Sequence, residues 1–223
     1  MISNSAANKA YEYLYQEIAS GRLEQGSPIS EVELATTLSM SRSPIREALR
    51  RMEAEGLVKH YPGRGTFISV ITVRDLEEIF QIRKMIELEG LRFAIDQISD
   101  DMLDSIAKEF EKAHETGDFS LHAVADARLH SMLVQCTGNV RLQNFMDMQD
   151  AQIKIVKSMS RRIEALHSKS FQTHIDIIES IKKRDLALAS ERLENHIDTV
   201  ERLTIENLRS HELQRSLNAG FES

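Results

Sequence analysis

Four side chains in the C-terminal two-thirds of the chain have the chemistry and spacing of a metal site: Asp126, His130, His174 and His196. Asp126 and His130 are four positions apart in a segment of helical pattern, so both project from the same helix face. A charged break at 182–185 separates His174 from His196 and indicates two adjacent antiparallel helices. One carboxylate and three imidazoles are therefore expected to converge from three helices.

This set of donor atoms favours a divalent transition metal. Imidazole nitrogen and carboxylate oxygen suit Zn, Ni, Fe, Cu or Mn, and we expect zinc or nickel. The four side chains include no thiolate, which argues against a closed structural zinc site. The alternative is a polar cluster that holds no ion. The other histidines have no partner at ligand spacing and are expected to be surface or core residues: His60, His114, His122, His167 and His211.

Composition indicates that helices must position these side chains. The 223 residues are 41% hydrophobic and include no Trp, 9 Gly and 3 Pro, which is typical of a mainly α protein. The single Cys136 excludes an internal disulfide framework and is compatible with a reducing cytosol. The N-terminus lacks the pattern of a signal peptide, and no run of 18 apolar residues occurs. We therefore expect a cytoplasmic protein without a membrane partner.

Residues 71–210 are predicted to form an all-α, six-helix antiparallel bundle. Thr72 to Asp75 matches an N-terminal capping pattern directly before an apolar run, so the first helix is expected to begin there. Helical periodicity then predicts helices near 72–98, 100–116, 119–137, 139–159, 161–183 and 185–210. Such a bundle places polar side chains from facing helices at its centre. Residues 211–223 are expected to be a flexible tail.

Residues 1–70 are predicted to form a winged helix-turn-helix that binds DNA. Helical patterns cover 7–20, 31–38 and 42–55, and a tight turn at 39–41 joins the last two. Two short β-prone runs, 57–58 and 66–68, flank a segment with Pro62 and Gly63 at its tip, which indicates a two-stranded wing. The net charge of −7 lies in residues 71–223, because eight basic and eight acidic side chains balance in residues 1–70.

The third of these helices carries an arginine stripe beside an apolar face. Arg42, Arg46 and Arg50 recur every four residues, which suits contact with guanine edges or phosphates in a major groove. Arg64, between the wing glycines, is expected to contact DNA as well. The alternative for the stripe is a solvated charged face, with the acidic partners Glu47, Glu53 and Glu55.

The N-terminal segment resembles the GntR family of bacterial transcription regulators over residues 8–70. The resemblance rests on the runs Ile29-Ser-Glu-Val-Glu-Leu-Ala and Ser41-Arg-Ser-Pro-Ile-Arg-Glu-Ala-Leu, followed by Glu55-Gly-Leu-Val and Gly63-Arg-Gly. It implies DNA contacts from Ser41, Arg42, Ser43, Arg46 and Gly65. Val32 departs from the pattern, since some relatives have a DNA-contacting arginine there, so their operator sequence is not transferable.

Residues 72–210 resemble the FCD ligand-binding domain of the FadR subfamily within this family. The resemblance rests on the run from Ile82 to Glu87, on Asp126 and His130 followed by Gly138-Asn139, and on the two later histidines. All four metal positions of the metal-containing branch match. The resemblance also implies that Arg83 faces an effector pocket, and the alternative for Arg83 is a salt bridge between helices, with Glu87 or another acid.

Together these features predict a dimeric transcription regulator that a small carboxylate effector controls through the metal centre. A two-fold dimer would bind a short palindromic operator in double-stranded DNA. Two alternatives remain open at this point. One is a metallohydrolase that uses the same Asp and three His, although no Glu neighbours the ligand positions in sequence. The other is a regulator for which the metal itself is the signal.

Overall fold

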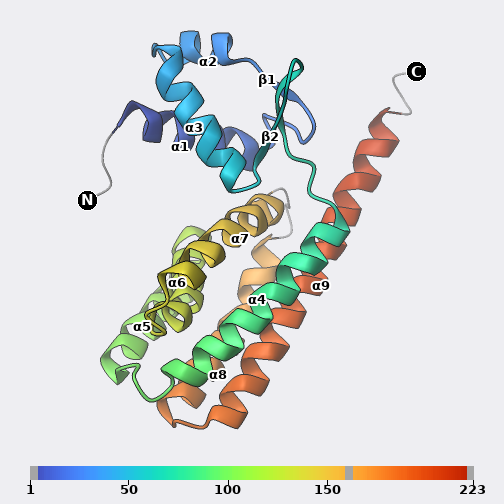
Figure 1. Cartoon of the computed structure of the whole chain (residues 1–223). Helices are drawn as coiled ribbons and strands as arrows, with labels where there is room; N and C mark the ends of the chain where they lie inside the picture. The colour runs from blue at the N-terminus through green and yellow to red at the C-terminus, as the bar shows by residue number, and fades with distance from the viewer. Residues whose placement is uncertain (1–4, 159–162, 220–223) are drawn as a thin grey trace. The chain divides into compact units, whose positions relative to one another are not determined.

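The computed structural model describes residues 5–158 and 163–219, and within them the chain divides into two compact units. The first unit contains the residues up to Thr72 together with the part of one helix that begins at Met148. The second unit contains the residues from Val73 to Asp147 and the described residues from Ile163 onward. The mainly α class predicted from the sequence, with a small sheet confined to the N-terminal unit, is confirmed (Figure 1).

The N-terminal unit is a three-helix cluster with a small sheet. Its helices and strands, in chain order, are α1 (Ala6–Ala19), β1 (Pro28–Ile29), α2 (Glu31–Thr37), α3 (Arg42–Ala54), β2 (Val58–Tyr61) and β3 (Gly65–Ile68). Ser5 and Ser30 accept hydrogen bonds from Asn8 N and Glu33 N at 3.2 Å each and thereby cap α1 and α2. Both α1 and α2 pack against α3, whose apolar face is buried.

The wing has three strands, in the order β1-β3-β2, and not the two that the sequence predicted. No strand was predicted before the helical pattern at 31–38, yet Pro28 and Ile29 pair antiparallel with Phe67 and Thr66 of β3. Proline lacks an N–H and therefore suits an edge strand such as β1. Ile29 at the same time buries its side chain in the core. The turn between β2 and β3 contains Gly63, whose φ of 74° favours glycine.

The C-terminal unit is built from long antiparallel helices (Figure 1). They are α4 (Val73–Ala94), α5 (Asp100–Thr116), α6 (Phe119–Gln135), the first part of α7 (Val140–Ser158), α8 (Ile163–Lys182) and α9 (Leu186–Ala219). α4 packs against α6 and α9, α5 against α6 and α8, and α8 against α9. Gly90 allows the close approach of α4 to α6, because a Cβ there would lie 2.8 Å from the Leu133 carbonyl oxygen.

The turn between α8 and α9 sets these two helices antiparallel. Arg184 adopts a left-handed φ of 56°, and Asp185 accepts a hydrogen bond from Leu188 N at 3.0 Å at the start of α9. The Arg184 guanidinium donates to Ile98 O and to Asp100 Oδ1, both at 2.9 Å, so the turn is fixed to the connection between α4 and α5.

Helix α9 extends to Ala219, so residues 211–219 are helical and not the expected flexible tail. The physical reason is composition, since this segment is rich in Leu, Glu, Gln and Arg and contains no Gly or Pro before Gly220. Residues 220–223 of that expectation lie outside the described residues. Across the described part of the chain, no helix combines the length and the apolar character that crossing a membrane requires.

Candidate metal centre

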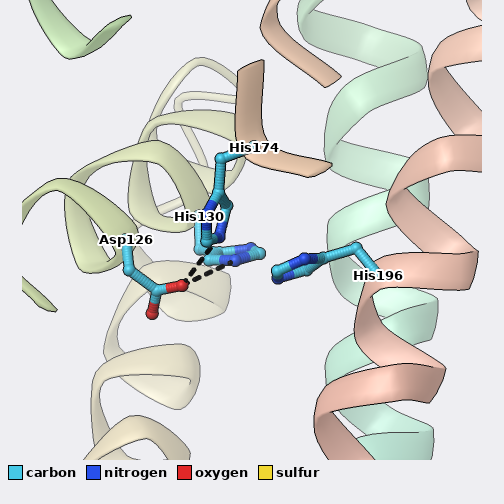
Figure 2. A group of neighbouring side chains, drawn as sticks. All are labelled: Asp126, His130, His174 and His196. Atoms are coloured by element: carbon cyan, nitrogen blue, oxygen red, sulfur yellow. Dashed lines mark ion pairs between the residues drawn. The ribbon is translucent and has the colours of Figure 1, made fainter. Parts of the chain in front are cut away.

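The structure brings the four predicted ligands together between three helices of the C-terminal unit (Figure 2). Asp126 and His130 come from α6, His174 from α8 and His196 from α9. One donor atom from each side chain lies within 4.8 Å of all the others. The imidazoles of His130 and His196 are 5.2 Å apart between ring centroids, and those of His174 and His196 are 4.4 Å apart. The four candidate ligands, which come from distant parts of the sequence, therefore form one compact cluster.

The carboxylate of Asp126 lies between two of the imidazoles. Its Oδ1 is 3.0 Å from His174 Nε2 and 3.6 Å from His130 Nε2. Asp126 is partly exposed, whereas the three histidines are buried. The cluster therefore has a protein-enclosed side made of imidazoles and a side nearer to solvent at the carboxylate. This arrangement suits a bound ion that keeps a position for an exogenous ligand.

The donor chemistry fits a divalent metal. His130 Nε2 is buried and has no hydrogen-bond partner among the described residues. A buried polar atom without a partner is costly and calls for an explanation, of which an ion is one. Three imidazoles and a carboxylate are the ligands that zinc and nickel accept, and neutral imidazole supplies the lone pair. Asp126, His130, His174 and His196 would hold the ion.

The buried ionisable groups around the cluster have pKa values that are shifted in different directions. Burial, reinforced by the neighbouring His174 and His130, lowers the pKa of His196 well below its usual value of 6.5. At His130, burial acts in the same direction, but the Glu87 carboxylate outweighs it and raises the pKa. Burial likewise opposes ionisation of Glu87, yet Arg83 and His130 lower its pKa. These directions favour the ionised carboxylate of Glu87 and the neutral imidazole of His196.

Aromatic packing positions His174, and the same packing includes a second buried histidine, His122. The Phe110 ring stacks on His174 with centroids 4.4 Å apart and an interplanar angle of 14°. His122 is also buried, with its ring centroid 5.1 Å from Phe110 and 5.4 Å from His174, and its Nε2 lies 3.0 Å from Ser170 Oγ. His122 lies outside the cluster of candidate ligands and is a core residue, which is one of the two places expected for it.

Arg83 is buried and forms a salt bridge with Glu87. Its Nε donates to Glu87 Oε1 at 2.5 Å. The bridge is within α4 and not between helices, since the two residues are one turn apart. The second oxygen of Glu87 lies 2.5 Å from His130 Nδ1 on α6. Arg83 is thus linked to one of the candidate metal ligands through one carboxylate.

The candidate DNA contacts are all exposed in the N-terminal unit: Ser41, Arg42, Ser43, Arg46, Arg50, Arg64 and Gly65. Ser41 is the N-cap residue of α3, and its side chain makes no cap hydrogen bond there. Arg46 pairs with Glu31 of α2 at 2.8 Å. The arginine stripe therefore occupies an exposed face of α3 that lies beside its buried residues.

Two of the three acids considered as partners for the stripe are engaged elsewhere. Glu53 Oε1 accepts from His60 N of the wing at 3.1 Å. Glu55 pairs with Arg51 at 3.0 Å and accepts a short hydrogen bond from Tyr11 OH. Glu53 and Glu55 thus hold the wing and α1 against α3, which disfavours the interpretation of the stripe as a face neutralised by these acids.

Comparison with known proteins gives two matching families and several similar chains. Residues 6–68 match the family described as bacterial regulatory proteins, gntR family, and residues 78–199 match the FCD domain. An uncharacterised HTH-type transcriptional regulator of Bacillus subtilis, YdhC, is 33% identical over 141 residues, which are 61% of this chain and 63% of that protein. The alignment therefore spans less than two thirds of that relative's length.

Two solved structures share the fold. A GntR transcriptional regulator from Rhodococcus sp. RHA1 has a TM-score of 0.75 at 20% identity, covering 90% of this chain and 97% of that one. The Zn²⁺-bound FCD domain of TM0439 has a TM-score of 0.55 at 24% identity, covering 64% of this chain and 99% of that domain. The two family matches together cover the winged helix-turn-helix and most of the helical unit. The chain belongs to the GntR family of bacterial regulatory proteins and has an FCD domain as its C-terminal part.

Proposed function

We propose that this protein is a dimeric transcription regulator whose affinity for its operator is controlled by a small carboxylate effector at a metal centre in the FCD domain. The observation that carries the proposal is the cluster of Asp126, His130, His174 and His196, with one donor atom from each within 4.8 Å of the others. The fold of the Zn²⁺-bound FCD domain supports it, since that domain has the same architecture.

The chain's own residues account for each part of the proposed response. A divalent ion at the centre supplies a Lewis-acidic position for a carboxylate oxygen. The three buried imidazoles enclose that position on the protein side, while partly exposed Asp126 lies toward solvent. Arg83, whose Nε donates to Glu87, is the proposed cation for an effector carboxylate, because the planar fork of a guanidinium matches carboxylate geometry.

The DNA-binding part of the proposal rests on the exposed side chains of the N-terminal unit. Arg42, Arg46 and Arg50 present guanidiniums along α3, and Arg64 does so on the turn of the wing. One such helix contacts few base pairs, so we propose a two-fold dimer on a short palindromic operator. Coupling of about 1–3 kcal/mol between effector and DNA would change operator affinity roughly 5–150-fold.

The metallohydrolase alternative loses its support at the family level. The two matched families and the Bacillus relative are regulators and not enzymes. The metallohydrolase hypothesis would also leave the exposed arginines of α3 without a role. The alternative in which the metal itself is the signal uses the same four ligands, and the experiment below separates it from control by a carboxylate.

The test uses the full chain and a duplex selected by the purified protein from random-sequence DNA. Affinity for that duplex is measured with the metal-free protein, after addition of Zn²⁺ or Ni²⁺, and then against mono-, di- and tricarboxylates. We expect a carboxylate to change DNA affinity only when metal is bound. A response to metal alone would instead establish the metal as the signal. A carboxylate response that persists after exhaustive chelation would refute the metal centre.

A further inference from the structure

Three buried side chains form a chain that ends at one metal ligand. Arg83 Nε donates to one oxygen of Glu87 at 2.5 Å, and the other oxygen of Glu87 lies 2.5 Å from His130 Nδ1. The exposed fractions of the three side chains are 4%, 0% and 1%. Glu87 is therefore the central member, and both of its oxygens have a partner.

The contact with Glu87 determines which nitrogen of His130 is available. An ionised carboxylate only accepts hydrogen bonds, so the hydrogen of a neutral His130 must be on Nδ1. The lone pair is then on Nε2, the nitrogen that lies 3.6 Å from Asp126 Oδ1 at the cluster. A ring turned the other way, or the other tautomer, would place a hydrogen where a metal has to bind.

A purely structural ion pair does not account for this geometry. Burying a carboxylate is costly, and one arginine already balances the charge of Glu87 within α4. The second oxygen reaches across to α6. Gly90, one turn further along α4, allows the two helices to approach closely, because a Cβ there would lie 2.8 Å from Leu133 O. The packing of α4 on α6 thus brings Glu87 to His130 in addition to Arg83.

The candidate ligand His196 is held by a weaker hydrogen bond than His130. His196 Nδ1 lies 3.3 Å from the neutral hydroxyl Thr173 Oγ1 on α8. A hydrogen bond to an ionised group is shorter and about twice as strong as one between neutral groups. Of these two histidines, His130 is therefore oriented by a carboxylate and His196 by a neutral hydroxyl.

We propose that Glu87 is a positioning residue of the metal centre, which holds His130 with Nε2 directed to the ion, and that Arg83 fixes Glu87 through its other oxygen. The proposal rests on the proposed metal centre. It gives the pairing of Arg83 with Glu87 a purpose besides stability. It also places the proposed effector contact, Arg83, two hydrogen bonds away from a metal ligand.

Zn²⁺ affinity of the full-length protein tests the proposal, measured by competition with a chelator at constant pH. Glu87→Gln removes the charge with little change of volume, and we expect Zn²⁺ to bind about 10–100-fold more weakly at unchanged stoichiometry. Glu89→Gln is the matched control, because Glu89 is an exposed acid on the same helix that pairs with Arg92 at 2.7 Å. It should bind Zn²⁺ as wild type does. Thr173→Val should lose less affinity than Glu87→Gln.

A second measurement, on the wild type, does not depend on whether Glu87→Gln folds. ¹⁵N shifts of the imidazoles in the metal-free protein at pH 9 report which nitrogen of His130 carries the hydrogen, with His130→Ala providing the assignment. We expect the hydrogen on Nδ1. Finding it on Nε2, or finding equal Zn²⁺ affinity in folded Glu87→Gln and wild type, would overturn the proposal. If the wild type binds no Zn²⁺, the metal centre itself fails, and the tautomer still decides whether Glu87 orients His130.

Discussion

The two units present their functional side chains in opposite environments. In the N-terminal unit, the candidate DNA contacts are exposed and belong to one helix and one wing. In the C-terminal unit, the candidate ligands are mostly buried and come from three helices, and the first and the last are 196 − 126 = 70 positions apart. Substitutions of the candidate DNA contacts should therefore change DNA affinity without changing the stability of the fold. Substitutions in the second should change ligand binding and packing together, because each imidazole is also part of the core.

The largest expected effect is the loss of metal in His174→Ala. His174 is a proposed ligand and stacks on Phe110, so its removal takes away a donor and opens space in the core. Elemental analysis should show a fall from about one ion per chain to close to none, because the ion needs all of its ligands in place. The response to carboxylates should disappear with the metal.

The same variant tests whether DNA binding by the N-terminal unit is independent of the metal centre. DNA affinity of His174→Ala for the selected duplex should stay near that of the metal-free wild type, because the N-terminal unit has its own core around Leu14, Ile45 and Met52. His114→Ala is the control, since this exposed imidazole lies in the same unit but outside the cluster, and it should retain the metal. Full metal content in folded His174→Ala would show that the ligand assignment is wrong.

The second expected effect concerns the exposed stripe. If Arg46 contacts a base, Arg46→Ala should weaken binding of the selected duplex by about 1–3 kcal/mol and relax the sequence preference at one position. Unfolding by urea should be almost unchanged, since Arg46 is exposed and surface ion pairs contribute about 0–1 kcal/mol. Fluorescence anisotropy with the selected duplex and with single-base variants measures both affinity and preference.

Glu31 provides the matched control for that prediction. Its carboxylate pairs with Arg46 in the structure, so DNA binding has to replace this pair. Glu31→Gln removes the competing anion and should bind the duplex at least as tightly as wild type does. Unchanged DNA affinity in folded Arg46→Ala would remove α3 as the recognition helix.

The sequence predicted the helices well, and the reasons are physical. Apolar positions at helical spacing and capping residues are local signals, and they placed α5 at 100–116, where the structure also has it. The strand at Pro28–Ile29 was missed, because a two-residue strand has no periodicity and exists only through its pairing with β3. The end of α9 was misplaced, since helix-forming residues without apolar periodicity resemble a disordered tail.

The candidate ligands were predictable from the sequence, whereas the contacts around them were not. Their residue types are uncommon and chemically distinctive, and the spacing of Asp126 and His130 is local. The link from Arg83 through Glu87 to His130 was not predictable, because it depends on how closely α4 approaches α6. For a related reason, the sequence left open whether His122 lies on the surface or in the core. Its burial beside Phe110 follows from the packing of α5, α6 and α8, which no local pattern encodes.

The third prediction tests that close approach. In Gly90→Ala, the added Cβ would lie 2.8 Å from Leu133 O, so the helices must shift. Alanine raises helix propensity by about 1 kcal/mol over glycine, whereas overpacking a core costs about 1–3 kcal/mol. We expect a net loss of unfolding free energy in urea titrations, accompanied by weaker Zn²⁺ binding because Glu87 and His130 are moved apart. A more stable variant with wild-type Zn²⁺ affinity would show that α4 and α6 do not need this contact.

The smallest expected effect belongs to the wing. Arg64 is exposed on the turn beside Gly65, and a lone guanidinium there suits a phosphate better than a base. Arg64→Ala should weaken binding to the selected duplex and to random duplexes by a similar factor, because phosphates carry no sequence information. The slope of log affinity against log salt should become shallower by about 1, as one fewer counterion is released. Arg92→Ala, which removes an exposed arginine paired with Glu89 in the C-terminal unit, should leave both affinity and slope unchanged. A loss confined to the selected duplex would instead make Arg64 a base contact, and the wing would then share the sequence recognition assigned to α3.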